Sequence, residues 1–171
     1  HQLNKVELVN FVRPDDSAEQ FDGLLAEAEV VLQRLGLPYR ILEMCTGDLG
    51  FTQRKNYEIE VWAPGDDMAT GPEIGGRWLE VSSVSNFGAF QARRAGLRYR
   101  PERHESASYL HTLNGSGVAV PRVMVALIEY YQNEDDTITI PEPLQPYMND
   151  LSVIDGHDPV GEAAVGAGKR E

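Results

Sequence analysis

The chain has 171 residues, which is enough for one domain with a buried core. Hydrophobic residues make up 42% of it, an ordinary share for a globular protein, and no apolar run approaches the length of a membrane span. The single cysteine, Cys45, excludes a disulfide framework and a multi-cysteine zinc site. We therefore expect a reduced, cytoplasmic setting, no structural zinc and no membrane partner.

The charge balance is strongly acidic, with 15 Lys and Arg against 27 Asp and Glu and a formal net charge of −12. A nucleic-acid surface requires clustered cations. The one such cluster in the sequence is formed by Arg93, Arg94, Arg98, Arg100 and Arg103. Acidic excess with few lysines would also suit a salt-adapted source, in which net charge maintains solubility.

The chain opens HQLNKVELVN, without an initiator Met or an apolar leader, so we expect a fragment whose beginning lies elsewhere. Residues 3–12 are predicted to form a strand. Ser17, followed three positions later by Gln20, predicts an N-cap and a capping box. Apolar residues then recur at helical spacing until Gly36, which is predicted to end the helix.

Three further strands are predicted in the next part of the chain. The first covers residues 37–45, and turn-forming residues then indicate a loop over 46–56. Residues 57–62, YEIEVW, alternate cleanly as the second strand. An irregular loop over 64–76 is expected to be mobile, and residues 77–85 form the third strand.

The second of these strands carries two carboxylates, Glu58 and Glu60, on its polar face. Paired carboxylates can perform acid–base or metal chemistry. Glutamates on the wet face of a strand are more often only solvated. The residues alone leave both interpretations open.

Next, Ser85 or Asn86 is predicted to cap a short helix that runs through Arg94. A hairpin follows, with strands at 97–100 and 107–113.

A strand, a small-residue turn and an apolar helix are then predicted over residues 111–132. The turn is Asn114-Gly115-Ser116-Gly117, and Arg122 lies in the first turn of the helix. Glycines allow close approach of a ligand, and a helix start supplies unpaired N–H groups and a positive dipole end. With a guanidinium beside them, these features suit a phosphate. The alternative is a plain strand-to-helix turn with a surface arginine.

The last ordered elements are predicted to be a short strand over 138–141 and a proline-braced closing segment over 141–148. Residues 149–171 are predicted to be a disordered tail. About six short strands in hairpin-like order, with three helices between them, predict an α+β fold: an antiparallel sheet flanked by helices.

Six stretches together carry a resemblance to a known family. They are HQLNKVE, YRILEMCTGDLGF, KNYEIEVWAPG, RWLEVSSVSNFGAFQARR, YLHTLNGSGVAVPRVMVALIEYYQ and ITIPEPLQPYM. In this order and spacing, the set closely resembles the C-terminal part of the catalytic domain of bacterial-type seryl-tRNA synthetases, which are class II enzymes. The resemblance covers residues 1–148, from the end of motif 2 through motif 3.

The resemblance implies a two-step reaction. Serine and ATP give seryl-adenylate and pyrophosphate, and the seryl group then passes to the terminal adenosine of tRNA(Ser). No protein nucleophile is required, because catalysis consists of positioning and charge stabilisation around an in-line attack, with Mg²⁺ neutralising the phosphates.

The resemblance also implies roles for the nucleotide-binding residues. Glu80 and Ser83 would ligate Mg²⁺ at the ATP phosphates, and Val81 and Ser82 would contact the nucleotide. Arg122 matches the motif 3 arginine that lies against the γ-phosphate. Arg122 and Glu80 are thus the expected catalytic residues.

For the amino acid, the resemblance implies that Glu7 holds the ammonium of serine. Asn114 and Ser116 would contact the substrate, with Thr112 nearby. A small polar pocket that hydrogen-bonds the serine hydroxyl rejects analogues without it.

The chain departs from the family pattern at several positions. Leu3 replaces the phenylalanine on which adenine stacks, which puts nucleotide affinity in doubt. Val84 replaces a cysteine, and Glu58 replaces an aspartate.

Parts of the family pattern are also absent: the tRNA-binding coiled-coil arm, motif 1 with much of the homodimer interface, and the first strand of motif 2. We therefore expect that this chain alone cannot aminoacylate.

Two other hypotheses stay open on the sequence. A truncated, non-catalytic paralogue could use the pocket for binding or regulation. Synthetase-like amino acid:carrier-protein ligases relate to a zinc-dependent branch, which the lone Cys45 argues against.

Overall fold

The computed structural model describes residues 2–65 and 75–156. The chain divides into two compact units, His1–Tyr130 and Tyr131–Glu171. The first unit contains, in chain order, β1 (Lys5–Val12), α1 (Ser17–Leu35), β2 (Tyr39–Glu43), β3 (Lys55–Ala63), β4 (Arg77–Asn86), α2 (Phe90–Ala95), β5 (Arg98–Tyr99), β6 (Ser108–Tyr109), β7 (His111–Ala119) and α3 (Val120–Tyr130).

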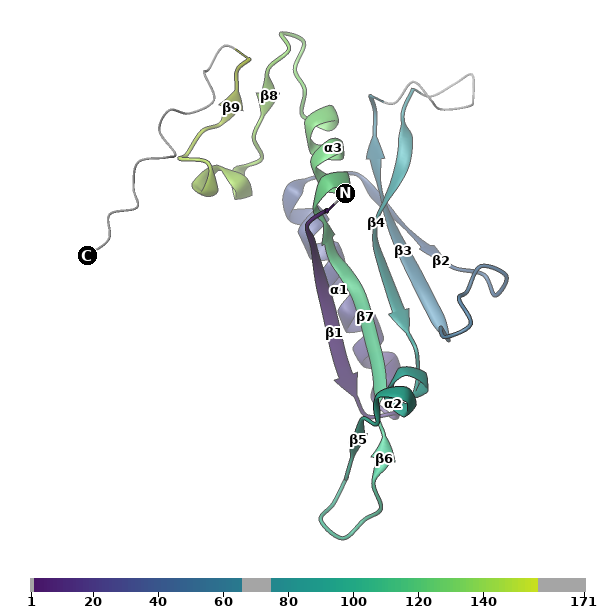
Figure 1. The fold of residues 1–171 in the computed structure, drawn as a ribbon. Coiled ribbons are helices and arrows are strands. Elements are labelled where there is room, and N and C mark those ends of the chain that lie inside the picture. Colours follow the sequence, from purple (N-terminus) through teal and green to yellow (C-terminus); the bar gives the residue numbers. More distant parts are fainter. Residues whose placement is uncertain (1, 66–74, 157–171) are drawn as a thin grey trace, which may run out of the picture. The chain divides into compact units, whose positions relative to one another are not determined.

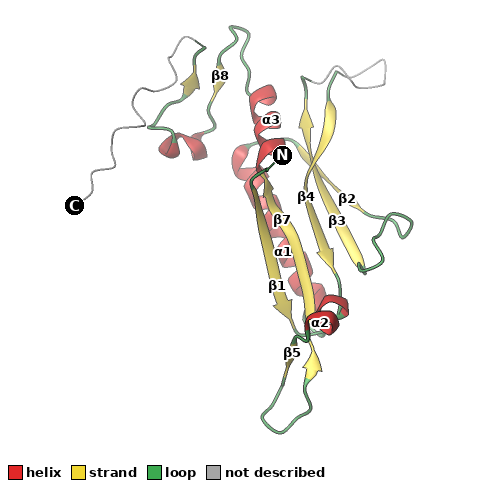
Figure 2. Ribbon diagram, viewed as in Figure 1, coloured by secondary structure: helices red, strands yellow, loops and turns green. Residues whose placement is uncertain are grey.

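The first unit is built on a five-stranded sheet with the order β1-β7-β4-β3-β2 (Figure 1). All of its strand pairs are antiparallel. Helix α1 packs along one face (Figure 2), where the Phe21 ring stacks on Tyr57 with 5.4 Å between centroids. Leu24, Ala28 and Leu32 on the same helix are buried. The predicted α+β class, an antiparallel sheet with helices, is confirmed.

Alternation along β3 separates a buried face from a polar one. Ile59, Val61 and Ala63 are fully buried. Glu58 and Glu60 lie between them on the opposite face, as the YEIEVW pattern predicted. The apolar side of the sheet is therefore used for packing, which leaves the other side for polar groups.

The start of α1 differs from the prediction. Ser17 is the first helical residue rather than the N-cap, Asp16 holds the N-cap position, and no side-chain cap hydrogen bond forms. The Ser17 hydroxyl is buried and accepts a hydrogen bond from Asn86 Nδ2 at 3.0 Å. The prediction of a capping box was wrong, because the Ser17 hydroxyl joins the helix to β4 instead. The predicted end at Gly36 is confirmed by its left-handed φ of 67°.

The predicted cap of α2 was also wrong. Asn86 is the last residue of β4, and the N-cap position is held by Ala89. The Asn86 side chain instead accepts a hydrogen bond from the Gly88 backbone N–H at 2.9 Å. The hairpin that follows α2 is confirmed as the pair β5–β6.

The largest difference concerns residues 114–117, which lie inside β7 and form no turn. Gly115 pairs with Leu8 on one side and with Val84 on the other. A Cβ at position 115 would lie 2.9 Å from Val84 Cγ2 and 3.2 Å from the Ser83 carbonyl oxygen. The glycine therefore serves the close approach of two strands. Helix α3 begins directly at Val120, with Arg122 in its first turn as predicted.

The second unit contains β8 (Ile138–Thr139), the 3₁₀-helix η1 (Glu142–Tyr147) and β9 (Val153–Ile154). Strand β8 confirms the strand expected over 138–141, and it pairs with β9. Strand β9 falls within residues 149–171, which were predicted to be a tail, while residues 157–171 lie outside the described residues. Most of the predicted loop over 64–76 also lies outside them.

Replacing Gly115 with alanine should destabilise the fold, because the added methyl group has no space between β7 and β4. We expect Gly115→Ala to lower the free energy of unfolding by about 1–3 kcal/mol, as overpacking does. Urea unfolding followed by circular dichroism measures it. Gly23→Ala is the matched control: its Cβ meets nothing within 4 Å, and alanine in a helix should stabilise by about 0.5–1 kcal/mol. Equal stability of Gly115→Ala and the wild type would contradict the packing argument.

Candidate active site

The strand register brings predicted site residues from three strands to one face of the sheet. Glu7 on β1 pairs with Ser116 on β7, and Asn114 on β7 pairs with Ser85 on β4. Directly paired residues project to the same side, as do residues two apart on one strand. Glu7, Ser116, Asn114 and Ser83 therefore share the face opposite α1.

A cavity of about 240 Å³ opens beside this face, where β7 passes into α3. Five predicted site residues line it: Leu3, Glu80, Val81, Ser116 and Arg122. The other lining residues are Asn4, Lys5, Ala119 and Pro121. The cavity thus joins predicted nucleotide-binding residues to one predicted serine-binding residue.

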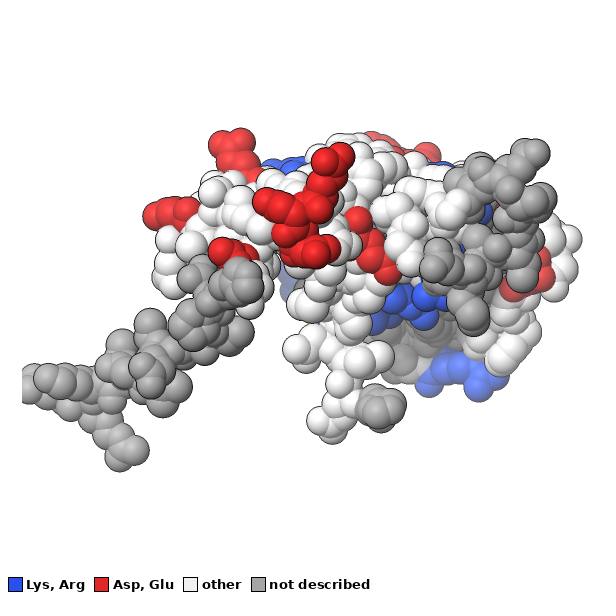
Figure 3. All heavy atoms as spheres, turned by 90° about the horizontal axis from the view of Figure 1, so that it is seen from above, with Lys and Arg blue, Asp and Glu red and all other residues white. Residues whose placement is uncertain are grey.

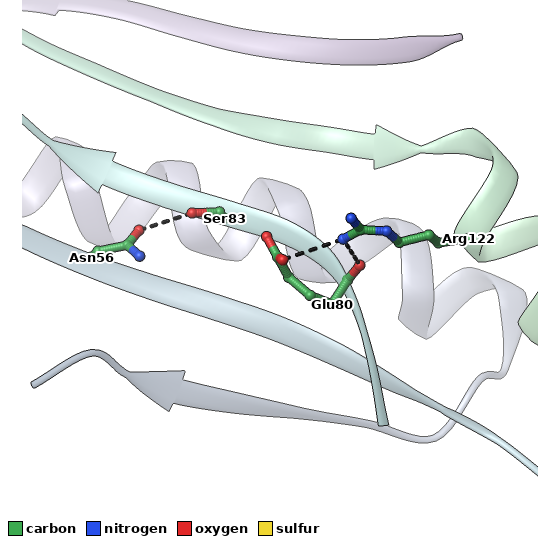
Figure 4. A network of polar contacts seen from close by, with 4 residues as sticks. All are labelled: Asn56, Glu80, Ser83 and Arg122. Carbon is green, nitrogen blue, oxygen red and sulfur yellow. Dashed lines mark hydrogen bonds and ion pairs between the residues drawn. The ribbon is translucent and has the colours of Figure 1, made fainter. Parts of the chain in front are cut away.

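The expected catalytic residues contact each other. Arg122 Nη1 donates to the Glu80 backbone carbonyl at 2.6 Å and lies 3.2 Å from Glu80 Oε2 (Figure 4). The arginine reaches from α3 across to β4, so its position depends on where the helix begins.

This ion pair is weak enough to be exchanged. The side chains of Arg122 and Glu80 are 55% and 40% exposed. Pairs of this kind contribute about 0–1 kcal/mol. A polyanion could therefore replace Glu80 as the partner of Arg122 at small cost.

Glu80 and Ser83 project from the same stretch of β4 (Figure 4). A carboxylate and a hydroxyl oxygen are hard ligands, and Mg²⁺ takes one or two such protein groups together with phosphate oxygens. The donors fit this ion in kind, so the assignment of Glu80 and Ser83 to magnesium stays a prediction. Among the described residues no group of three or more His, Cys, Asp or Glu could hold a metal, and the exposed Cys45 thiol donates to Asp48 at 3.2 Å.

Glu7 already holds an ammonium group. Its carboxylate lies 2.8 Å from Lys5 Nζ, and the two side chains are 41% and 50% exposed. The lysine ammonium is the same chemical group as the one that serine would present. Glu7 is therefore accessible to such a ligand and chemically suited to it.

Two predicted ligand-binding hydroxyls form hydrogen bonds within the protein. Buried Ser82 donates to the backbone carbonyl of Ser116 at 2.6 Å, and buried Thr112 donates to Gln91 Oε1 at 2.7 Å. The first hydrogen bond joins β4 to β7, and the second joins β7 to α2. The contacts of Ser82 and Thr112 with substrate stay predictions.

Sequence reasoning missed Asn56, which it assigned to a loop. Asn56 is buried on β3, and its Oδ1 accepts hydrogen bonds from Ser83 at 3.1 Å and Ser85 at 2.9 Å. Gln53, also missed, donates to Ser85 at 2.8 Å. The alternation of YEIEVW, continued one residue upstream of Tyr57, was the available signal for Asn56.

Carboxylates crowd the polar face of β3 and β4. Burial raises the pKa of Glu58, and the charges of Glu80, Glu60 and Asp48 raise it further. Acidic side chains also cover more of the surface seen in Figure 3 than basic ones do. The carboxylates around Glu58 and Glu80 therefore favour a cation on this part of the sheet face.

Comparison with known proteins identifies the family. The model of the class II tRNA synthetase core domain (G, H, P, S and T) matches residues 1–131. The chain belongs to this family. The chain is 92% identical over its whole length to the serine–tRNA ligase of Haloquadratum walsbyi, of which it covers 37%. It is 55% identical over 154 residues to that of Bacillus pumilus, with 90% of this chain and 34% of that protein covered.

A solved structure of seryl-tRNA synthetase from Pyrococcus horikoshii, complexed with ATP, matches this class II core with a TM-score of 0.81 and 40% identity. The match covers 90% of this chain and 32% of that one. The chain spans 37% of the length of the serine–tRNA ligases of Haloquadratum walsbyi and Halobacterium salinarum. No described helix is long and apolar enough to cross a membrane.

Neutralising Glu58 should stabilise this class II core at neutral pH. A raised pKa means that the folded state binds a proton at Glu58 more tightly than the unfolded state does. The contribution of Glu58 to stability is therefore lost as the pH rises above 4.5, the ordinary pKa of this carboxyl group. We expect Glu58→Gln to raise the thermal unfolding midpoint at pH 7 by a few degrees, with a smaller gain at pH 4. Exposed Glu27→Gln on α1 is the control. An increase in the unfolding midpoint of Glu58→Gln that became larger as the pH fell would contradict the expected direction.

Proposed function

We propose that this chain carries the C-terminal half of the active site of a serine–tRNA ligase. One observation carries the proposal: Arg122 and Glu80 meet at a cavity that Ser116 also lines, on the sheet face that presents Glu7. Arg122 provides a cation for phosphate, Glu80 an anion for a metal ion, and Glu7 an anion for the ammonium group of serine. The chemistry is activation of L-serine by ATP, followed by transfer to tRNA(Ser).

In the first step, Arg122 turns from Glu80 to the γ-phosphate of ATP, where its guanidinium stabilises charge on the departing pyrophosphate. The released Glu80 carboxylate and the Ser83 hydroxyl would hold Mg²⁺, which would supply neutralisation of phosphate charge at this position. Asn56 fixes the Ser83 hydroxyl through the 3.1 Å hydrogen bond. The serine carboxylate then attacks the α-phosphate in line.

Serine is held on the adjoining part of the face. Its ammonium replaces Lys5 at Glu7, and its hydroxyl meets Asn114 and Ser116, with Thr112 behind them. Binding exchanges one ammonium for another, so Glu7 is never left as an unpaired carboxylate. A hydrogen-bonded hydroxyl explains why alanine would be rejected.

The adenosine part of ATP lies toward Leu3, which is 72% exposed and lines the cavity. Leucine provides apolar contact without aromatic stacking. Val81 lines the same cavity, and Ser82 supports the adjoining backbone of β7.

We place the chain in a bacterial-type enzyme whose remaining length supplies the tRNA-binding arm, motif 1 and the first strand of motif 2. That enzyme would act as a cytoplasmic homodimer. The 55% identity to the Bacillus pumilus ligase supports the subtype, and the chain's 37% share of its relatives supports a partial active site. The 171 residues alone should not serylate tRNA.

The alternative, a non-catalytic paralogue used for binding or regulation, is not favoured. Glu7, Glu80 and Arg122 are all present, and identity to a serine–tRNA ligase reaches 92% over the whole chain. A paralogue freed from catalysis has no reason to keep all three charges.

Serine-dependent ATP–pyrophosphate exchange by the full-length protein tests the function. Arg122→Ala should lower the exchange rate by about 10²–10³-fold, as the loss of one charge-stabilising donor does in other enzymes. Glu80→Gln should raise the concentration of Mg²⁺ required. Arg34→Ala, at the exposed end of α1, is the matched control and should exchange at the wild-type rate. Undiminished exchange by Arg122→Ala would refute the proposed role.

A further inference from the structure

The five clustered arginines lie on one element pair outside the candidate active site. Arg93 and Arg94 end α2, and Arg98 begins the β5–β6 hairpin, which also carries Arg100 and Arg103. All five are exposed. We call these residues the arginine surface. Residues 87–110 contain only two acidic side chains, Glu102 and Glu105, in a chain whose net charge is −12.

Aromatic rings hold several of these guanidinium groups in place. Arg93 and Arg98 lie over the Tyr109 ring at 5.1 and 4.6 Å, and Arg98 Nη2 donates to the Tyr109 hydroxyl at 2.7 Å. Arg94 lies over the Phe90 ring at 4.6 Å. Stacked guanidinium groups lose less freedom when they bind, and their N–H donors remain available at the edges.

None of these five arginines forms an ion pair with a described residue, although the chain has 27 Asp and Glu. Beside them, Phe51 is 88% exposed and packs edge-on against Phe90, with 5.7 Å between centroids. Free guanidinium donors next to an exposed ring are the combination that binds RNA, with phosphates on the cations and an unpaired base on the ring.

A protein partner fits this surface less well. Residues 87–110, all of which the structure describes, expose no large apolar side chain. Protein interfaces usually contain an apolar core from which charged residues are depleted. A second copy of this chain would have to dock on the charged groups and the exposed Phe51 ring, without an apolar core.

We propose that the arginine surface binds the phosphate backbone of tRNA, with Phe51 stacking on an unpaired base. The choice of tRNA as the RNA rests on the proposed function. Gln91 on α2 accepts the Thr112 hydrogen bond at 2.7 Å, which joins α2 to β7 at the end of that strand away from α3 (Figure 1). RNA bound here would be held close to the strand that carries Asn114 and Ser116.

The test uses the full-length protein and a fluorescently labelled tRNA(Ser) transcript, with affinity measured by anisotropy across a salt series. Arg93→Ala/Arg98→Ala should weaken binding by about 3- to 10-fold and reduce the slope of log affinity against log salt by about 2, for two lost phosphate contacts. Arg100→Ala/Arg103→Ala, which disturbs no ring contact, should do the same. Phe51→Ala should weaken binding about 5-fold without changing the slope.

Arg34→Ala is the matched control and should bind as the wild type does. All variants should keep the wild-type rate of ATP–pyrophosphate exchange, which needs no tRNA. If the wild-type protein showed no ATP–pyrophosphate exchange, the proposed function would be refuted. The tRNA affinities would still test the arginine surface separately. Unchanged affinity and slope in both double variants would overturn the inference. The inference would also be overturned if analytical ultracentrifugation showed a lower oligomer mass for the double variants than for the wild type, because the arginine surface would then be a protein interface.

Discussion

The close approach of β7 to β4 determines where every proposed site group lies. Gly115 permits it, because a side chain there would enter the space of Val84. With β4 on one side and β1 on the other, β7 fixes the register that places Glu7 beside Ser116 and Asn114 beside Ser85. Because the strand continues to Ala119, α3 begins at a defined point and Arg122 reaches Glu80. A slip of one residue would turn these side chains to the packed face.

Both proposed charge-binding groups hold counter-ions from the protein itself. Arg122 is paired with Glu80, and Glu7 is paired with Lys5. Each pair is partly exposed, so opening it costs little. Ligand binding then becomes an exchange of partners, which avoids unpaired charges in a site already crowded with carboxylates. Burial raises the pKa of Glu58, and the charges of Glu80, Glu60 and Asp48 raise it further. A divalent cation at Glu80 would relieve that repulsion.

Much of the architecture could be predicted from local patterns. Alternation in YEIEVW gave β3 and its buried face, helical spacing up to Gly36 gave α1, and the α+β class followed from their order. Errors arose where a side chain serves a distant partner. Ser17 bonds Asn86 instead of capping its helix, and Gly115 accommodates Val84 instead of making a turn. Neither partner is visible in a sequence read along the chain.

The hydrogen bonds and strand pairings around the candidate site could not be predicted from the sequence, and the roles of the predicted site residues stay predictions. The resemblance named Glu7, Glu80, Ser83 and Arg122, and the structure gathers them around one sheet face. It could not supply Asn56, whose role depends on strand pairing. The most direct test of the central claim is a crystal structure of the full-length protein with serine, a non-hydrolysable ATP analogue and Mg²⁺. The account predicts Arg122 on the γ-phosphate, away from Glu80, and the serine ammonium on Glu7. An Arg122–Glu80 pair left intact beside bound nucleotide would contradict it.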